Sequence, residues 1–504
     1  MSIADCRLKL TVAIAALILC CAALAQAPPK AQPTPPKPDV VPQAPNPPAS
    51  ESKPQARPQP KPDHKMTPAE AKELLASVDE ILAFDSRDTR LKIKHPIKRQ
   101  LASRDQVQKF VEERMKDDED AQRLQRSEAV LKKFGLVPRD FDLRSFLVEL
   151  LREQVAGYYD SKTKTVYLLD WLEPETQLPV MAHELTHALQ DQNVGLEKWV
   201  KRGTSEKTPA DEVRGDEEIA ARHAIIEGQA MAVMIDYLLA PMGGSVTKSP
   251  MVTKAIQESM MTGTGSPVFD RAPLFLKRVL LFPYSYGLDF ERELLEKKGL
   301  EAAYAGVLKK PPQNTRQVME PATYLADEKL VDVPMPDFGK LLGSEWEKYD
   351  VGSIGEFDVA LMAEIYANAD TAKKMYPNWR GGWYYAAKKK GTDTIGLVFV
   401  SKWVNLDAAK TFASLYGSTV DKRYKTTGTG GGGAIGGGSP HCISGDCSNS
   451  LGASTGFVDT TDGRVYLAVS HMDADTVLAI ESLPPDLALR VQDAVLTKYA
   501  AAGK

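Results

Sequence analysis

Between residues 68 and 153, apolar residues recur every three to four positions, which is the spacing of amphipathic helices. This pattern predicts helices over residues 68–83, 104–116, 119–134 and 142–153. The first begins with a capping box, Thr67-Pro68-Ala69-Glu70, with proline in the first turn. Ser103 to Gln106 supplies a second cap, and Gly135 a stop. This part of the chain is therefore expected to be mostly helical.

The next segment has the pattern of a β-hairpin. Residues 155–159 and 165–169 are rich in β-branched and aromatic residues, and the polar residues 160–164 separate them. An exposed edge strand here can bind an extended peptide by main-chain pairing, largely independently of the peptide's sequence. The alternative, that the hairpin is simply part of a core sheet, is compatible with this role.

Two strongly apolar segments follow the hairpin. The first runs from Leu178 to Leu189, and the second, from Ala220 to Ile235, is apolar on all sides and so predicts a buried helix. Further helix is expected from about residue 251 and over Leu288 to Lys298. Residues 66–340 are therefore predicted to form one mostly helical domain with a small sheet.

Near residue 345 the pattern changes to alternating strands and helices. Residues 394–400 and 465–469 read as strands, and residues 406–416 and 485–499 as amphipathic helices. This predicts a smaller α+β domain with an antiparallel sheet over residues 345–504, so the fold class of the whole chain is α+β. The glycine-rich stretch 428–438 lacks the Lys and Ser/Thr of a phosphate-binding loop and is interpreted as a connection.

The N-terminal residues resemble an export signal. Arg7 and Lys9 precede an uncharged apolar run, and Ala23-Leu24-Ala25 offers a cleavage site after Ala25. The run is short for a membrane span, so no stable span is expected after cleavage. Residues 26–65 are proline-rich and predict a disordered linker. The protein is expected to be periplasmic or secreted.

The mature chain would keep two cysteines, Cys442 and Cys447. In an oxidising compartment they favour a small disulfide loop. Zinc binding by this pair with His441 is less favoured, because a fourth ligand is missing.

The overall charge adds little to these predictions. The 63 Lys and Arg residues nearly balance the 67 Asp and Glu residues, for a net charge of -4, and no long basic patch is present. The composition gives no support for nucleic-acid binding. It gives no indication of the oligomeric state.

The candidate chemistry lies in the first apolar segment, which contains His183-Glu184-Leu185-Thr186-His187. Residues four apart on a helix lie one above the other, so the two histidines can bind one metal ion. Glu184 is about a hundred degrees around the same turn and can take a proton from a metal-bound water. The motif predicts a zinc site.

A catalytic zinc usually has three protein ligands and a water. Glu227 is the best third candidate, because a lone carboxylate in the buried helix around it would be costly unless it binds a cation. Gly228 weakens that helix, which is understandable if another backbone approaches closely. His223, one turn earlier, is the competing ligand, an outer partner of the site or simply a polar residue at the edge of the helix.

With these residues the chain resembles zinc metallopeptidases of the gluzincin type. It is most similar to a little-characterised group of secreted prokaryotic proteins that place the glutamate ligand in an Ala-x-x-Glu-Gly-x-Ala segment, here Ala224 to Ala230. Residues 153–160, Tyr284-x-x-Gly287-x-x-Phe290 and residues 311–318 also fit that group. The resemblance covers about residues 140–420 and implies a zincin-like catalytic domain.

The resemblance implies hydrolysis of a peptide or protein substrate. Zinc held by His183, His187 and Glu227 would activate water, and Glu184 would act as general base and pass the proton to the leaving amine. A further donor should stabilise the oxyanion. The candidates are Tyr284, Tyr286 and His223, although aromatic residues in a segment such as 282–286 are more often packing residues.

One position departs from the group's pattern. Glu320-Pro321 stands where a histidine usually precedes the proline. If that histidine stabilises the oxyanion, its role here is vacant or is taken by another residue. The departure keeps open a catalytically inactive, exported zinc-containing binding or scaffold protein. A zinc amidase that acts on cell-wall peptides is the second alternative.

Overall fold

The computed structural model describes residues 64–114, 118–154, 157–201, 207–262, 266–427, 453–470 and 475–502. The predicted signal segment at residues 1–25, almost all of the linker, the glycine-rich stretch 428–438 and the cysteines Cys442 and Cys447 lie outside these ranges.

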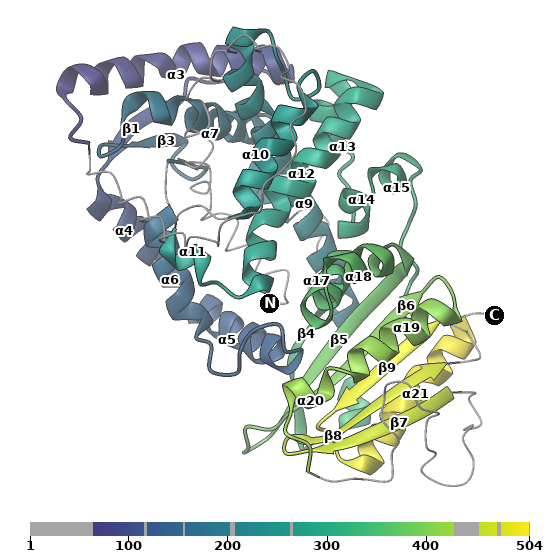
Figure 1. The fold of residues 1–504 in the computed structure, drawn as a ribbon. Coiled ribbons are helices and arrows are strands. Elements are labelled where there is room, and N and C mark those ends of the chain that lie inside the picture. Colours follow the sequence, from purple (N-terminus) through teal and green to yellow (C-terminus); the bar gives the residue numbers. More distant parts are fainter. Residues whose placement is uncertain are drawn as a thin grey trace, which may run out of the picture.

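Of the described residues before residue 345, most are helical (Figure 1). The predicted caps are present: Thr67 Oγ1 accepts from the Glu70 N–H, and Ser103 Oγ from the Gln106 N–H. The helices are α3 (Pro68–Thr89), α4 (Arg104–Arg114), α5 (Asp118–Lys133), α6 (Leu143–Gln154), α7 (Pro174–Val194), α8 (Leu196–Val200), α9 (Pro209–Leu239), η2 (Ala240–Met242), α10 (Pro250–Thr262), α11 (Pro267–Asp270), α12 (Leu274–Lys298), the π-helix η3 (Ala302–Gly306), α13 (Val307–Lys309), α14 (Thr315–Met319), α15 (Pro321–Leu325) and α16 (Phe338–Leu342).

Three long helices, α7, α9 and α12, form the centre of the helical part. Helix α9 packs along α12 and also against α7. The predicted helix from Leu288 is only the second half of α12, which continues through Pro283. A proline inside a helix removes one backbone hydrogen bond. Pro283 is itself buried in the core.

The predicted hairpin belongs to a three-stranded sheet. Strands β2 (Tyr158–Asp160) and β3 (Thr165–Leu169) pair antiparallel, and β1 (Lys98–Ala102) pairs with β3 in parallel. The order β1-β3-β2 makes β2 an outer strand. β1 was not predicted, because its partner is distant in sequence.

The last part of the chain contains a six-stranded antiparallel sheet, as the alternating pattern predicted. Its order is β4-β5-β6-β9-β8-β7. The strands are β4 (Trp346–Ser353), β5 (Trp379–Lys389), β6 (Ile395–Trp403), β7 (Ala453–Thr460), β8 (Gly463–Ser470) and β9 (Thr476–Glu481). The helices that accompany them are α17 (Glu356–Tyr366), α18 (Ala369–Met375), η4 (Tyr376–Asn378), α19 (Leu406–Gly417), α20 (Val420–Arg423) and α21 (Pro485–Ala502).

Alternation along the central strands gives this sheet two apolar faces. Tyr384 and Phe399 belong to the main core together with Phe412 of α19, whereas Trp383 and Val400 pack in a second core with α21. Helices therefore cover both faces (Figure 1). The α+β fold class is confirmed.

The main core runs across the predicted boundary near residue 345. Phe134, at the end of α5, packs edge-on against Tyr384 and Phe399 of the sheet, and Phe282 of α12 packs against Phe357 of α17. The division into domains at 66–340 and 345–504 stays a prediction.

Candidate metal centre

Helix α7 holds the two predicted histidines in the interior. His183 and His187 lie on one face of the helix because they are four residues apart. His183 is fully buried, and His187 nearly so. The helix ends at Gly195, whose φ of 71° suits glycine and lets its N–H donate to the Asp191 carbonyl.

Glu227 reaches the histidines from α9, whose position depends on close packing against α12. A Cβ atom on Gly228 would overlap the backbone of Gly287 in α12, and one on Gly287 would overlap the Ala224 carbonyl. The paired glycines therefore let the two helix backbones touch. The close approach expected at Gly228 is confirmed.

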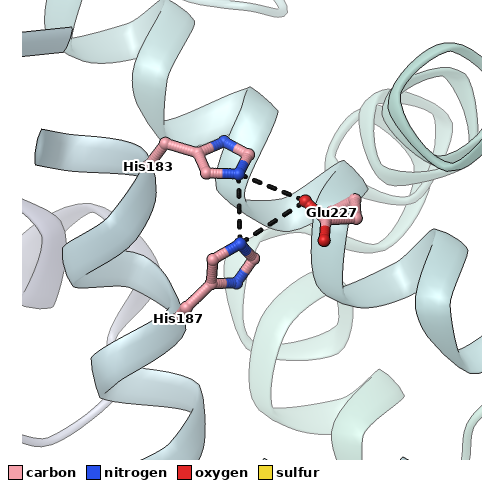
Figure 2. Close-up of side chains that lie close together, drawn as sticks. All are labelled: His183, His187 and Glu227. Atoms are coloured by element: carbon pink, nitrogen blue, oxygen red, sulfur yellow. Dashed lines mark hydrogen bonds and ion pairs between the residues drawn. The ribbon is translucent and has the colours of Figure 1, made fainter. Parts of the chain in front are cut away.

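Three side-chain atoms converge at the centre, as Figure 2 shows. The Nε2 atoms of His183 and His187 are 3.0 Å apart. Glu227 Oε2 lies 3.1 Å from the first and 3.4 Å from the second. All three residues are buried.

These separations fit a small cation. Ligand atoms placed tetrahedrally at about 2.0–2.1 Å from one ion lie about 3.3–3.4 Å apart. Two imidazole nitrogens and a carboxylate oxygen are also suitable ligands for divalent transition metals. The buried His183, His187 and Glu227 can therefore bind a metal ion.

The electrostatics of the group also call for positive charge at its centre. Burial alone would lower the pKa of His187, but the Glu227 carboxylate outweighs it and raises the pKa to about 9. Burial would raise the pKa of Glu227, but His187 and His183 hold it well below its usual range. Without a metal, a proton on His187 supplies this charge; a metal ion would displace it.

Glu184 lies beside the centre in a defined orientation. Its Oε2 accepts a 2.7 Å hydrogen bond from the Tyr159 N–H of the outer strand β2. Its Oε1 is buried and has no hydrogen-bond partner among the residues that the structure describes. Burial raises the pKa of Glu184, an effect that the two histidines oppose. One oxygen is thus anchored, and the other is free to exchange a proton.

The neighbours of the motif include a residue that sequence reasoning missed. Gln190 Oε1 lies 3.0 Å from His187 Nδ1, and Gln190 is completely buried. Its place three residues after His187 on the same helix was a usable signal. Asp191 accepts from the hydroxyl of Tyr159 and pairs with Lys164, which ties the hairpin to α7. That contact joins distant segments and has no local signature.

The three candidate oxyanion donors lie in different places. Tyr284 is buried next to His183, and its hydroxyl has a weak contact with Glu227 but no hydrogen bond of good geometry within the described ranges. Burial first, and then Glu227 and Glu184, raise its pKa well above the usual value. Burial lowers the pKa of His223 to about 4 despite Glu227, so His223 is neutral beside the centre. Tyr286 instead packs on Phe282 and Phe357.

Glu320, the position that departs from the group's pattern, contacts a different cluster. It lies 2.6 Å from Arg316, which also pairs with Glu356 at 2.8 Å and Glu328 at 3.3 Å. Arg316 and Glu356 are buried, and they join α14 to α17. In this structure Glu320 therefore pairs with Arg316, the residue that joins these helices.

Comparison of the chain with protein-family models, with curated proteins and with solved structures found no match.

Proposed function

We propose that this protein is an exported zinc-dependent metallopeptidase of the gluzincin type, with a zincin-like catalytic domain in its helical part. The observation that carries the proposal is the meeting of His183, His187 and Glu227 beside the buried carboxylate of Glu184. A metal site that only stabilised a fold would not need an adjacent base.

Zinc suits this set of ligands. Two histidines and a glutamate leave a fourth position open for water or substrate. When bound, zinc lowers the pKa of water towards neutrality and polarises a substrate carbonyl. The three ligand residues hold that chemistry next to Glu184.

Glu184 acts as the general base. The Tyr159 N–H fixes its Oε2, so the free Oε1 accepts a proton from the attacking water. The water oxygen adds to the peptide carbonyl, and the proton then passes from Oε1 to the amine as the C–N bond breaks.

Tyr284 is the best candidate for the oxyanion donor. Its hydroxyl keeps its proton, because the pKa is raised, and its contact with Glu227 is weak enough for it to donate to a new partner. His223 is second, because its free Nε2 also lies near Glu227. Tyr286 is not proposed for this role, since its ring packs away from the centre.

The substrate would lie along β2. This strand is at the edge of its sheet, and its Tyr159 N–H already contacts Glu184. An extended peptide that pairs with a strand edge is held mainly through its backbone. We therefore expect cleavage of unfolded polypeptides with little dependence on their sequence.

The test uses the full-length protein loaded with one equivalent of zinc and a fluorescently labelled unfolded protein as substrate. Glu184→Gln should retain zinc and lose nearly all cleavage, because the amide cannot accept the proton. Glu175→Gln, an exposed change on the same helix, serves as the matched control and should remain active.

Other results would decide between the alternatives. If the wild type and Glu184→Gln both bind zinc and neither cleaves the substrate, the alternative of a binding or scaffold protein is favoured. Cleavage of cell-wall peptides but not of unfolded protein would favour the amidase. Cleavage that survives Glu184→Gln would refute the proposed base.

A further inference from the structure

A chain of buried amides connects one candidate ligand to a distant helix. His187 Nδ1 faces Gln190 Oε1 at 3.0 Å. The Gln190 amide nitrogen donates to the Ile226 carbonyl at 3.1 Å and to Gln229 Oε1 at 2.9 Å. Both glutamines are completely buried. Both the oxygen and the nitrogen of the Gln190 side-chain amide therefore have hydrogen-bond partners.

The far end of the chain lies on the π-helix η3. The Gln229 amide nitrogen donates to the carbonyls of Ala303 and Tyr304 at 2.9 and 3.2 Å. Carbonyl oxygens only accept hydrogen bonds, so the NH₂ group of Gln229 must face them. Its Oε1 then faces Gln190 and requires the NH₂ group of that residue.

These hydrogen bonds also determine which tautomer of neutral His187 binds a metal. With its NH₂ group turned to Gln229 and Ile226, Gln190 presents an oxygen to the imidazole. His187 Nδ1 must therefore carry the hydrogen, which leaves Nε2 with the lone pair that a metal needs. Two backbone carbonyls of η3 thus select the tautomer of a ligand through two side chains.

His183 offers an internal contrast. Its Nε2 points to the same centre, but its Nδ1 is buried and has no partner in the described part of the chain. Of the two histidines, only His187 is oriented by a complete set of hydrogen bonds. Metal binding should therefore respond more strongly to changes in the hydrogen-bond partners of His187 than to changes around His183.

We propose that Gln190 and Gln229 are positioning residues that hold His187 in its metal-binding tautomer from the π-helix η3. The inference rests on the proposed metal site and deepens it. Outer partners of metal-bound histidines typically change metal affinity by about 10–100-fold. We expect a loss of that size for Gln190→Leu and a smaller loss for Gln229→Leu, which acts one residue further away.

The test measures zinc affinity of the full-length protein by competition with a chromophoric chelator, and the absorption spectrum of the cobalt-substituted protein. Gln177→Leu is the matched control. Gln177 is also a completely buried amide on α7, but it bonds to the backbone of Leu169. The Gln177→Leu variant should have a lower melting temperature than the wild type, with the same zinc affinity and the same cobalt spectrum.

Gln190→Glu separates tautomer control from packing. A carboxylate still accepts from His187 Nδ1 but cannot donate to Gln229 or Ile226. Tautomer control predicts that this variant keeps zinc affinity far better than Gln190→Leu. Its zinc affinity is also compared directly with that of the wild type, which it should approach, so the variant is informative even if Gln190→Leu fails to fold.

Several outcomes would overturn the inference. One is Gln190→Leu binding zinc within twofold of the wild type; another is Gln190→Glu losing as much affinity as Gln190→Leu. An equal loss in Gln177→Leu would show a general effect of destabilisation. If the wild type itself binds no zinc, the proposed function fails, which is distinguishable from failure of the positioning role alone.

Discussion

Among the single residues of the candidate metal centre, the buried polar atoms without hydrogen-bond partners are as informative as the three atoms that converge. Buried polar atoms are normally hydrogen-bonded. Beside the three converging ligand atoms, Glu184 Oε1 and His223 Nε2 are buried without a partner among the residues described, and the Tyr284 hydroxyl has a weak contact with Glu227. Such a concentration is costly in a structural core and is expected where water and a substrate must bind.

Tyr284→Phe tests one of these atoms. Removing one donor to a developing oxyanion typically lowers kcat by about 10²–10³-fold. We expect that loss with little change in bound zinc, because Tyr284 is not one of the converging ligands. Steady-state kinetics and metal analysis of the same preparation provide the measurement, and Tyr286→Phe is the matched control. Unchanged kcat in Tyr284→Phe would exclude the assigned role.

The sequence predicted the core of this site for physical reasons that are local. His183, Glu184 and His187 lie within one helix, where spacing determines which side chains share a face. Glu227 could be chosen because a buried carboxylate demands compensation. The Tyr159 N–H and the Gln229 amide could not be predicted, because their roles depend on segments that meet only in three dimensions.

At the scale of elements, the contact of α9 with α12 determines where Glu227 lies. Gly287→Ala would force its Cβ into the Ala224 carbonyl, so the helices must separate. Overpacking of this kind typically costs about 1–3 kcal/mol. Urea unfolding should show that loss, together with weaker zinc binding. Gly339→Ala in α16, where the new Cβ meets Asp337 at an ordinary 3.4 Å, should be nearly neutral; equal effects would contradict the account.

The contact of α3 with α9 should make stability depend on pH. Burial, and then Asp236, raise the pKa of Asp88 from 3.8 to about 8, and burial raises that of Asp236 to about 6. Between the ordinary aspartate pKa of 3.8 and about pH 8, the folded protein binds more protons than the unfolded chain. Its free energy of unfolding therefore falls as pH rises through this range.

Urea unfolding of wild type and Asp88→Asn at several pH values tests this dependence. The variant's stability relative to wild type should increase from pH 4 to about pH 8, because the amide cannot ionise. Asp79→Asn, an exposed change on the same helix, is the control. A difference that stays constant with pH would show that the pair does not titrate in this range.

Elements were predictable to different degrees. The helices α4 to α6 have local periodicity, and the sequence located them to within about two residues, whereas α3 begins as predicted but continues past the predicted end at residue 83 to Thr89. The first half of α12 was missed, because Pro283 and neighbouring aromatics obscure the helical pattern. Strands β1, β4, β5, β7 and β9 were not identified, since strand pairing depends on distant partners.

At the scale of the whole molecule, buried charges help hold the helical part against the six-stranded sheet. Glu481 of β9 is completely buried and accepts from Arg423 at 2.8 Å and from Tyr416 at 2.7 Å. Arg423 also donates to the Lys133 carbonyl at the end of α5. One ion pair therefore joins the last strands to an early helix.

Breaking this pair should cost much more than losing a surface pair. Glu481→Leu leaves Arg423 buried without its carboxylate, which typically costs about 3–5 kcal/mol. The double variant Arg423→Met/Glu481→Leu should recover part of that loss. Asp459→Asn, which breaks the more exposed pair with Arg464, should cost about 0–1 kcal/mol. If urea unfolding shows that the double variant is as unstable as Glu481→Leu, the buried Arg423 charge is not the cause of the loss.

The segment that contains α9 shows that length and apolar composition alone do not identify a membrane span. Pro209–Met242 is apolar and long enough to cross a membrane, but 72% of its most apolar window is buried inside the protein. Here the segment forms the core helix that carries Glu227. Its apolar character is therefore accounted for by packing.

The most direct test of the central claim is the zinc content of the full-length protein, measured by mass spectrometry after zinc loading and removal of free metal. The account predicts about one zinc per wild-type chain. It predicts a large loss in His187→Ala and in Glu227→Ala. Wild-type protein without zinc, or variants that retain as much as the wild type, would contradict the assignment of His183, His187 and Glu227 as the metal centre.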